Sequence, residues 1–323
     1  MTTHFGDRLT EATLKKEAAV CVGFDPLIQR IPLEISNEFG TEAIRDQPCW
    51  SRCDRESLAN AILAYGRGVI DAVAPIVPVI KINIAFFEPY YSEGIRAYFQ
   101  TVRYAQEAGL LVIGDIKRAD IGHSTIQYAE AHLGGVEPDP DERFAMPDAV
   151  TVNPYFGYDA IRPFVEAASD RGRGLFVLVQ TSNESAAEVQ GAMLSDHTTL
   201  SHHVAELVQG WASESGLVGQ RGYSCIGAVV SPRDVEVSRD LREMMPNCIF
   251  LVPGFGAQGR TAEEVSTCFK DDGTGALVSA SRSVIYAYQN VRYQGTGSPR
   301  SWQSCIAEAA TDLVTSVRTV LTV

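Results

Sequence analysis

The chain has 323 residues, of which 45% are hydrophobic and 21% are charged, a composition typical of globular proteins. Its formal net charge of −13 disfavours a nucleic-acid surface, which needs clustered lysine and arginine, although a few local donors could still bind a small anion. The N-terminus lacks the apolar core of a signal peptide, and no apolar run reaches the ~18 residues that span a bilayer, so we expect a cytoplasmic protein without membrane contact.

Eight short apolar runs rich in valine and isoleucine follow one another along the chain, and several are continuous, as buried parallel strands are. In chain order they are Ala19–Asp25, Ile76–Asn83, Leu111–Lys117, Ala149–Asn153, Leu175–Thr181, Cys225–Ser231, Cys248–Pro253 and Ala276–Ser281. Helix-like stretches lie between them, among them Ser57–Val73, Glu93–Ala108, His202–Ser215 and Thr261–Phe269.

Eight strand-then-helix units predict a single (β/α)8 TIM barrel, an α/β fold, as one domain over residues 1–323. An open doubly wound sheet is the structural alternative, but it would not need eight such runs. Two stretches, Ile28–Asp54 and Val136–Pro147, are interpreted as surface insertions; the second is rich in proline and acidic residues.

Polar residues gather where the predicted strands end, and in a barrel these ends form the face that carries the active site. The residues are Asp25, Lys81, Asn83, Asp115, Lys117, Asn153, Thr181, Ser182, Asn183, Ser281 and Arg282. Structural needs alone would not place so many polar groups at one end of buried strands, so the pattern favours function.

Asp115 and Lys117 are two residues apart on a predicted strand, so both side chains should leave on the same face, and Asp120 follows in the loop. Alone, this string could be a solvated charge cluster; its place after a buried strand favours a catalytic role. Neighbouring carboxylates favour the charged form of a lysine. Such a lysine is a poor Schiff-base nucleophile but is suited to stabilise a carbanion and then protonate it.

A glycine-rich stretch around Gln258 and Gly259 ends the seventh strand, and Arg282 follows the eighth. Barrels often bind phosphate at this place through backbone N–H groups, and an arginine adds a bidentate donor. A lone glycine pair would indicate only a turn; with the arginine at the next strand end, phosphate binding is the better interpretation.

Seven cysteines are present, and the closest pair, Cys49 and Cys53, has no partner pair with zinc-ligand spacing. We therefore expect reduced thiols in a cytoplasmic protein and no metal site.

The sequence resembles the orotidine 5′-phosphate decarboxylase family, in particular its longer type 2 bacterial branch. The matching segments lie in order on successive strand ends: Val20–Pro26, Lys81–Glu88, Gly114–Gly122, Thr151–Tyr155, Thr181–Asn183, Pro253–Gly259 and Ser281–Ala287.

The resemblance implies an enzyme of de novo pyrimidine biosynthesis without cofactor, a carboxy-lyase that converts orotidine 5′-monophosphate to uridine 5′-monophosphate and carbon dioxide. It implies a homodimer in which Asp120 enters the partner subunit's site. The residue roles that it implies are the catalytic network Asp115, Lys117 and Asp120, the ribose ligands Asp25 and Lys81, the pyrimidine contact Ser182, and the phosphate ligands Gln258, Gly259 and Arg282.

The sequence departs from the family pattern at two places. A threonine usual four residues after the third carboxylate is replaced by Ser124, with Thr125 next, so either hydroxyl could contact the substrate. Glu184 follows the Thr-Ser-Asn motif where proline or glycine is usual, which could alter the loop up to His197.

Two alternative functions stay open from the residues. One is a magnesium-dependent sugar-phosphate decarboxylase of the same wider family, which shares the Asp-x-Lys-x-x-Asp string. The other is a barrel that binds nucleotides without catalysis.

Overall fold

The computed structural model describes residues 4–42, 54–134, 145–255, 262–295 and 300–321. Eight parallel strands form a closed barrel in chain order, and β1 pairs with both β2 and β8. The strands are β1 Val20–Phe24, β2 Val79–Asn83, β3 Leu111–Arg118, β4 Ala149–Val152, β5 Gly174–Gln180, β6 Ile226–Val230, β7 Phe250–Val252 and β8 Ala276–Ala280. The predicted (β/α)8 barrel is therefore confirmed, and the open-sheet alternative is wrong.

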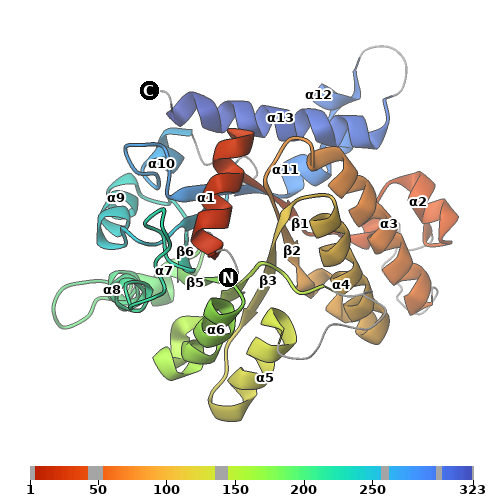
Figure 1. Ribbon diagram of the computed structural model, residues 1–323. Helices are drawn as coiled ribbons and strands as arrows, with labels where there is room; N and C mark the ends of the chain where they lie inside the picture. The colour runs from red at the N-terminus through yellow and green to blue at the C-terminus, as the bar shows by residue number, and fades with distance from the viewer. Residues whose placement is uncertain (1–3, 43–53, 135–144, 256–261, 296–299, 322–323) are drawn as a thin grey trace.

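Helices surround the barrel (Figure 1). Those that follow strands are α3 Arg55–Val73, α4 Tyr91–Glu107, α5 Gly122–Leu133, α6 Tyr158–Asp170, α8 Leu200–Ala212, α9 Val235–Met244, α10 Ala262–Ser266 and α11 Arg282–Ile285. The additional ones are α1 Phe5–Lys16, α2 Leu33–Glu38, α7 Ala186–Gln190, α12 Val291–Gln294 and α13 Trp302–Leu321. The predicted insertion at 28–54 contains α2, and its residues 43–53 lie outside the described part of the chain, as do residues 136–144 of the second insertion.

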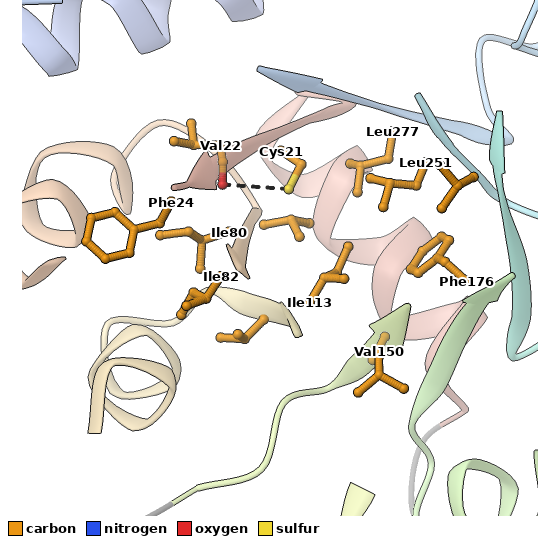
Figure 2. Close-up of a cluster of buried hydrophobic side chains, with 14 of the residues drawn as sticks. Cys21, Val22, Phe24, Ile80, Ile82, Ile113, Val150, Phe176, Leu251 and Leu277 are labelled. Atoms are coloured by element: carbon orange, nitrogen blue, oxygen red, sulfur yellow. Dashed lines mark hydrogen bonds between the residues drawn. The ribbon is translucent and has the colours of Figure 1, made fainter. Parts of the chain in front are cut away.

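Side chains on the strands alternate between the barrel interior and the layer beneath the helices. Figure 2 shows Ile113, Phe176, Leu251 and Leu277 gathered inside the ring of strands, where all are buried. Phe24 points outward instead, and its ring lies 5.6 Å from that of Tyr65 on α3. Apolar burial on both faces of each strand explains why the apolar runs of the sequence were continuous.

Helix α1 closes the amino-terminal end of the barrel, a role that the strand pattern did not predict. Phe5 is 2% exposed, and its ring packs edge-on against Phe176 inside the barrel at 6.1 Å between centroids. A Cβ on Gly174 would come within 2.1 Å of the Phe5 ring, so the glycine makes room for this packing. The opposite, carboxyl-terminal end of the barrel is the end at which the polar residues gather.

We expect Phe5→Ala to lower the free energy of unfolding by about 3–5 kcal/mol, because it removes a buried aromatic side chain and leaves a cavity at the end of the barrel. Urea-induced unfolding measures this loss. Leu14→Ala, on the exposed face of the same helix, should change stability by no more than about 0.5 kcal/mol. Equal losses in the two variants would show that α1 does not seal the barrel through Phe5.

Candidate active site

The carboxyl-terminal ends of the first three strands bring together four of the residues predicted from the sequence. Asp25 follows β1, Lys81 lies in β2, and Asp115 and Lys117 lie in β3. Neighbouring pairs in the parallel ladder, such as Lys81 with Ile113, place these side chains around one opening.

Asp115 lies between two ammonium groups. Its Oδ2 is 2.6 Å from Lys81 Nζ, and its Oδ1 is 2.5 Å from Lys117 Nζ. Lys81 Nζ also lies 4.0 Å from Asp25 Oδ1, so the charges alternate around the opening. The Asp115 side chain is only 6% exposed, whereas that of Lys117 is 49% exposed. Of the Asp115–Lys117 pair, Lys117 is thus the group that a ligand can reach.

Thr151 in β4 completes this network and was missed by the sequence reasoning. Its Oγ1 donates to Asp115 Oδ1 at 2.9 Å and accepts a hydrogen bond from the Lys117 backbone N–H at 3.0 Å. Its position two residues before the polar strand end at Asn153 would have placed it on the same inward face, and this was the available signal.

The backbone of β3 is irregular between Asp115 and Lys117. Gly114 pairs with Val150 and Arg118 with Val152, so residues 115–117 lie opposite Thr151 alone. Lys117 has a φ of +46°, a conformation that is rare for residues other than glycine. Asp115 and Lys117 were predicted to leave the strand on one face by simple alternation. Their side chains do meet, with Lys117 Nζ 2.5 Å from Asp115 Oδ1, but the strand between them is bulged and does not alternate regularly.

The charges determine the protonation states of the buried pair. Burial alone would raise the pKa of Asp115, but the charges and hydrogen bonds of Lys81 and Lys117 outweigh it and hold that pKa well below its ordinary value. Burial alone would lower the pKa of Lys81, but Asp115 and Asp25 outweigh it and hold that pKa above its ordinary value. Both groups are therefore ionised at neutral pH.

Among the residues that the structure describes, several buried polar atoms at the same end of the barrel have no hydrogen-bond partner: Asp25 Oδ1, Gln180 Oε1, Ser231 Oγ and Ser281 Oγ. They lie at the ends of β1, β5, β6 and β8. A buried polar atom left unpaired costs about 1–3 kcal/mol, so a group of them at one opening indicates a place where a polar ligand binds.

The predicted site residues after β3 are Asp120, Ser124 and Thr125, and their hydrogen bonds are made outside the Lys81–Asp115–Lys117 network. The Asp120 carboxylate accepts a hydrogen bond from the Ile121 N–H at 2.8 Å, and within the described ranges no ion pair joins it to Lys117. Ser124 is exposed on the first turn of α5. Thr125 is fully buried, and its hydroxyl donates to the Ala160 carbonyl of α6 at 2.7 Å. Of the two hydroxyls considered, only that of Ser124 is accessible.

The remaining predicted residues lie at the ends of β5, β7 and β8. Ser182 is half-buried just after β5, and Arg282 is exposed at the start of α11. Gln258 and Gly259 lie outside the described residues.

Within the described ranges, no group of three or more histidine, cysteine or acidic residues could hold a metal ion. The closest candidates, Asp25 and Asp115, already have the Lys81 ammonium between them. Of the helices in the part of the chain that the structure describes, none is long and apolar enough to cross a membrane.

Comparisons with known proteins agree with this arrangement. The model of the orotidine 5′-phosphate decarboxylase / HUMPS family matches residues 63–293. The chain is 36% identical over 305 residues to an orotidine 5′-phosphate decarboxylase of Rhodopirellula baltica, covering 94% of this chain and 96% of the relative. It is 38% identical over 288 residues to one of Caldicellulosiruptor bescii, covering 89% and 91%.

Solved structures show the same fold. The structure described as an orotidine 5′-phosphate decarboxylase of Streptomyces avermitilis aligns with a TM-score of 0.73 at 29% identity, covering 100% of this chain and 98% of that one. The OMP decarboxylase of Leishmania donovani aligns with a TM-score of 0.72 at 24% identity, covering 99% and 100%. The second likeness supports the fold alone.

We expect Asp115→Asn to lower the free energy of unfolding at pH 7 by about 3 kcal/mol, because it leaves the buried Lys81 without its nearest counter-charge. The pKa of Asp115 is lowered in the folded protein, so its contribution is fully present above about pH 4 and is lost as the pH falls towards the folded value. The difference between wild type and variant in urea unfolding should therefore shrink below about pH 4.

Asp240→Asn, at an exposed position on α9, is the matched control and should change stability by less than about 0.5 kcal/mol at either pH. A difference between wild type and Asp115→Asn that does not depend on pH would contradict the assigned protonation state.

Proposed function

The chain belongs to the orotidine 5′-phosphate decarboxylase family, and we propose that it converts orotidine 5′-monophosphate to uridine 5′-monophosphate and carbon dioxide in pyrimidine biosynthesis. The observation that carries this function is the Lys81–Asp115–Lys117 network at the carboxyl-terminal end of the barrel, with an accessible ammonium on a buried carboxylate.

Lys117 would stabilise the charge that forms when carbon dioxide leaves. Breaking the bond between C6 and the carboxylate leaves an electron pair in an in-plane orbital at C6, which the π-system cannot delocalise. A fixed positive charge beside that carbon lowers the barrier electrostatically. Lys117 Nζ then gives a proton to C6, forming the C–H bond of the product, and recovers one from water.

Asp115 would act in two ways. Its ionised carboxylate holds the Lys117 ammonium at 2.5 Å and so fixes where the proton donor lies. It would also lie beside the substrate carboxylate, where repulsion between like charges is relieved as carbon dioxide leaves.

The rest of the opening would hold the nucleotide. We assign Asp25 and Lys81 to the ribose hydroxyls and Ser182 to the pyrimidine. Ser124 is assigned as the helix hydroxyl that contacts substrate, since Thr125 is buried and already bonded. The phosphate is assigned to Gln258, Gly259 and Arg282. Binding energy from this distant phosphate can be used at the reacting carbon.

A homodimer would complete the site. Large apolar side chains are exposed beside Asp120 and after the neighbouring strand β4: Ile121, Ile126, Tyr155 and Phe156. A second copy of the chain would cover this surface and receive Asp120 into its own network. The five cysteines that the structure describes are buried and free, which supports a reducing cytoplasm as the compartment.

We expect Lys117→Ala to lower kcat by roughly a thousand-fold or more, because it removes both the stabilising charge and the proton donor. The measurement is the loss of orotidine 5′-monophosphate absorbance on adding purified protein in the presence of EDTA. Lys15→Ala, an exposed lysine on α1 at the closed end of the barrel, is the control and should keep full activity.

The same assay separates the proposed function from its rivals. A wild type that leaves orotidine 5′-monophosphate unchanged but decarboxylates a keto-sugar phosphate, with that activity abolished by EDTA, would favour the magnesium-dependent sugar-phosphate decarboxylase. Tight binding of uridine 5′-monophosphate without decarboxylation would favour a non-catalytic nucleotide-binding barrel. Near-normal turnover in Lys117→Ala would remove the lysine from the mechanism.

The shared site predicts complementation between two inactive variants. In a dimer of one Lys117→Ala protomer and one Asp120→Asn protomer, one site carries both substitutions and the other carries neither. Random reassociation of equal amounts should therefore restore roughly a quarter of wild-type activity. Mixtures that stay as inactive as the separate variants would place Asp120 in its own chain's site or outside catalysis.

A further inference from the structure

The segment after β5 is held at its start by a side chain that returns from α7. Gln190, the last residue of α7, accepts a hydrogen bond from the Thr181 N–H through Oε1 at 2.9 Å. Its Nε2 donates to Thr181 Oγ1 at 2.7 Å, and Thr181 Oγ1 in turn donates to Asn183 Oδ1 at 2.6 Å. A single amide thus fixes both the backbone and the side chain of Thr181.

The far side of the segment is held from the next strand of the barrel. Arg233, just after β6, donates through Nη1 to the Asn183 carbonyl at 2.7 Å and through Nη2 to the Glu184 carbonyl at 3.4 Å. The Asn183 carbonyl also accepts the Ala186 N–H at 3.1 Å, which begins the turn into α7. Within the described ranges Arg233 forms no ion pair with a carboxylate. Its guanidinium donates to backbone carbonyls instead.

Ser182 lies in the middle of these contacts but takes no part in them. No hydrogen bond of its side chain is present among the residues that the structure describes, and the residue is half-buried at the opening of the barrel. Its neighbours on both sides are held by hydrogen bonds, so the backbone at Ser182 is fixed, while its hydroxyl has no bond to any described residue.

We propose that Gln190 and Arg233 are positioning residues for recognition of the pyrimidine base, acting through Ser182. We call Thr181, Asn183, Gln190 and Arg233 the base clamp. The inference rests on the proposed function, because it takes Ser182 as the pyrimidine contact. It assigns a task to the loop between β5 and α8, where Glu184 departs from the family pattern.

The physical basis is that the clamp orders the segment before the ligand arrives. A free segment would lose backbone and side-chain freedom on binding, and that loss would weaken affinity. Gln190 is suited to this task because an amide accepts and donates at once, whereas a glutamate at this place would meet the Thr181 hydroxyl oxygen with a second acceptor.

The test compares a ligand that has a base with one that lacks it. We expect Gln190→Ala and Arg233→Ala each to raise the inhibition constant of uridine 5′-monophosphate about 3- to 10-fold and to lower kcat/KM for orotidine 5′-monophosphate by a similar factor. The inhibition constant of ribose 5-phosphate, which has no base, should change less than about twofold. Gln190→Glu should resemble Gln190→Ala, since it loses the donor to Thr181.

Glu188→Ala is the control, because Glu188 is exposed on the same helix and should leave both constants unchanged. Thermal unfolding of each variant shows whether it is folded. Equal weakening of both ligands, or no weakening of uridine 5′-monophosphate, would overturn the clamp. A wild type that fails to decarboxylate would overturn the proposed function instead, and calorimetric titration of uridine 5′-monophosphate into Gln190→Ala would still test the clamp.

Discussion

The buried charge of Asp115 is the constraint on which the rest of the site depends. A carboxylate that is 6% exposed can stay ionised only where opposite charges and donors replace its water, and here both of its oxygens are engaged. Lys81 and Thr151 are committed to this task by their contacts at 2.6 and 2.9 Å. Lys117 is the one member of the group that combines a contact to Asp115 with a side chain open to the solvent. The same electrostatic balance therefore keeps the buried carboxylate ionised and leaves one ammonium of the network, that of Lys117, open to a ligand.

Much of the fold could be predicted because strand burial leaves a strong signal. Every predicted apolar run overlaps a strand of the barrel, and the ends differ by three residues at most; β2 begins three residues after its run, at Val79, and β3 extends one residue further, to Arg118. Helix α1 was not predicted, because its buried apolar side chains are few, chiefly Phe5 and Leu9, and do not form a long apolar face. The glycine that accommodates it, Gly174, has no distinguishing pattern in the sequence.

Of the candidate site, the residues at strand ends could be predicted from the sequence, whereas those that support them could not. Asp25, Lys81, Asp115 and Lys117 were placed together because strand ends of a parallel barrel meet. For Thr151 the sequence offered only its position two residues before Asn153, because its two hydrogen bonds depend on the bulge of β3 opposite it. Gln190 and Arg233 were also invisible to pattern reasoning: both lie outside the strands, and only the folded path of the loop brings Gln190 back to Thr181, nine residues earlier.

Because Phe5 closes the amino-terminal end of the barrel, ligands and water can enter and leave at the other end only. Buried side chains fill the interior of the barrel between Phe5 and Asp115, so the barrel is open at its carboxyl-terminal end and has no channel through it. In the proposed mechanism, the nucleotide, carbon dioxide and the water that recharges Lys117 would all use that opening. While a nucleotide occupied it, bulk water would have no second route to the lysine, so in the proposed mechanism each cycle would deliver the one proton that was loaded before the substrate entered. Recharging of the lysine would then follow departure of the product, which couples proton supply to turnover.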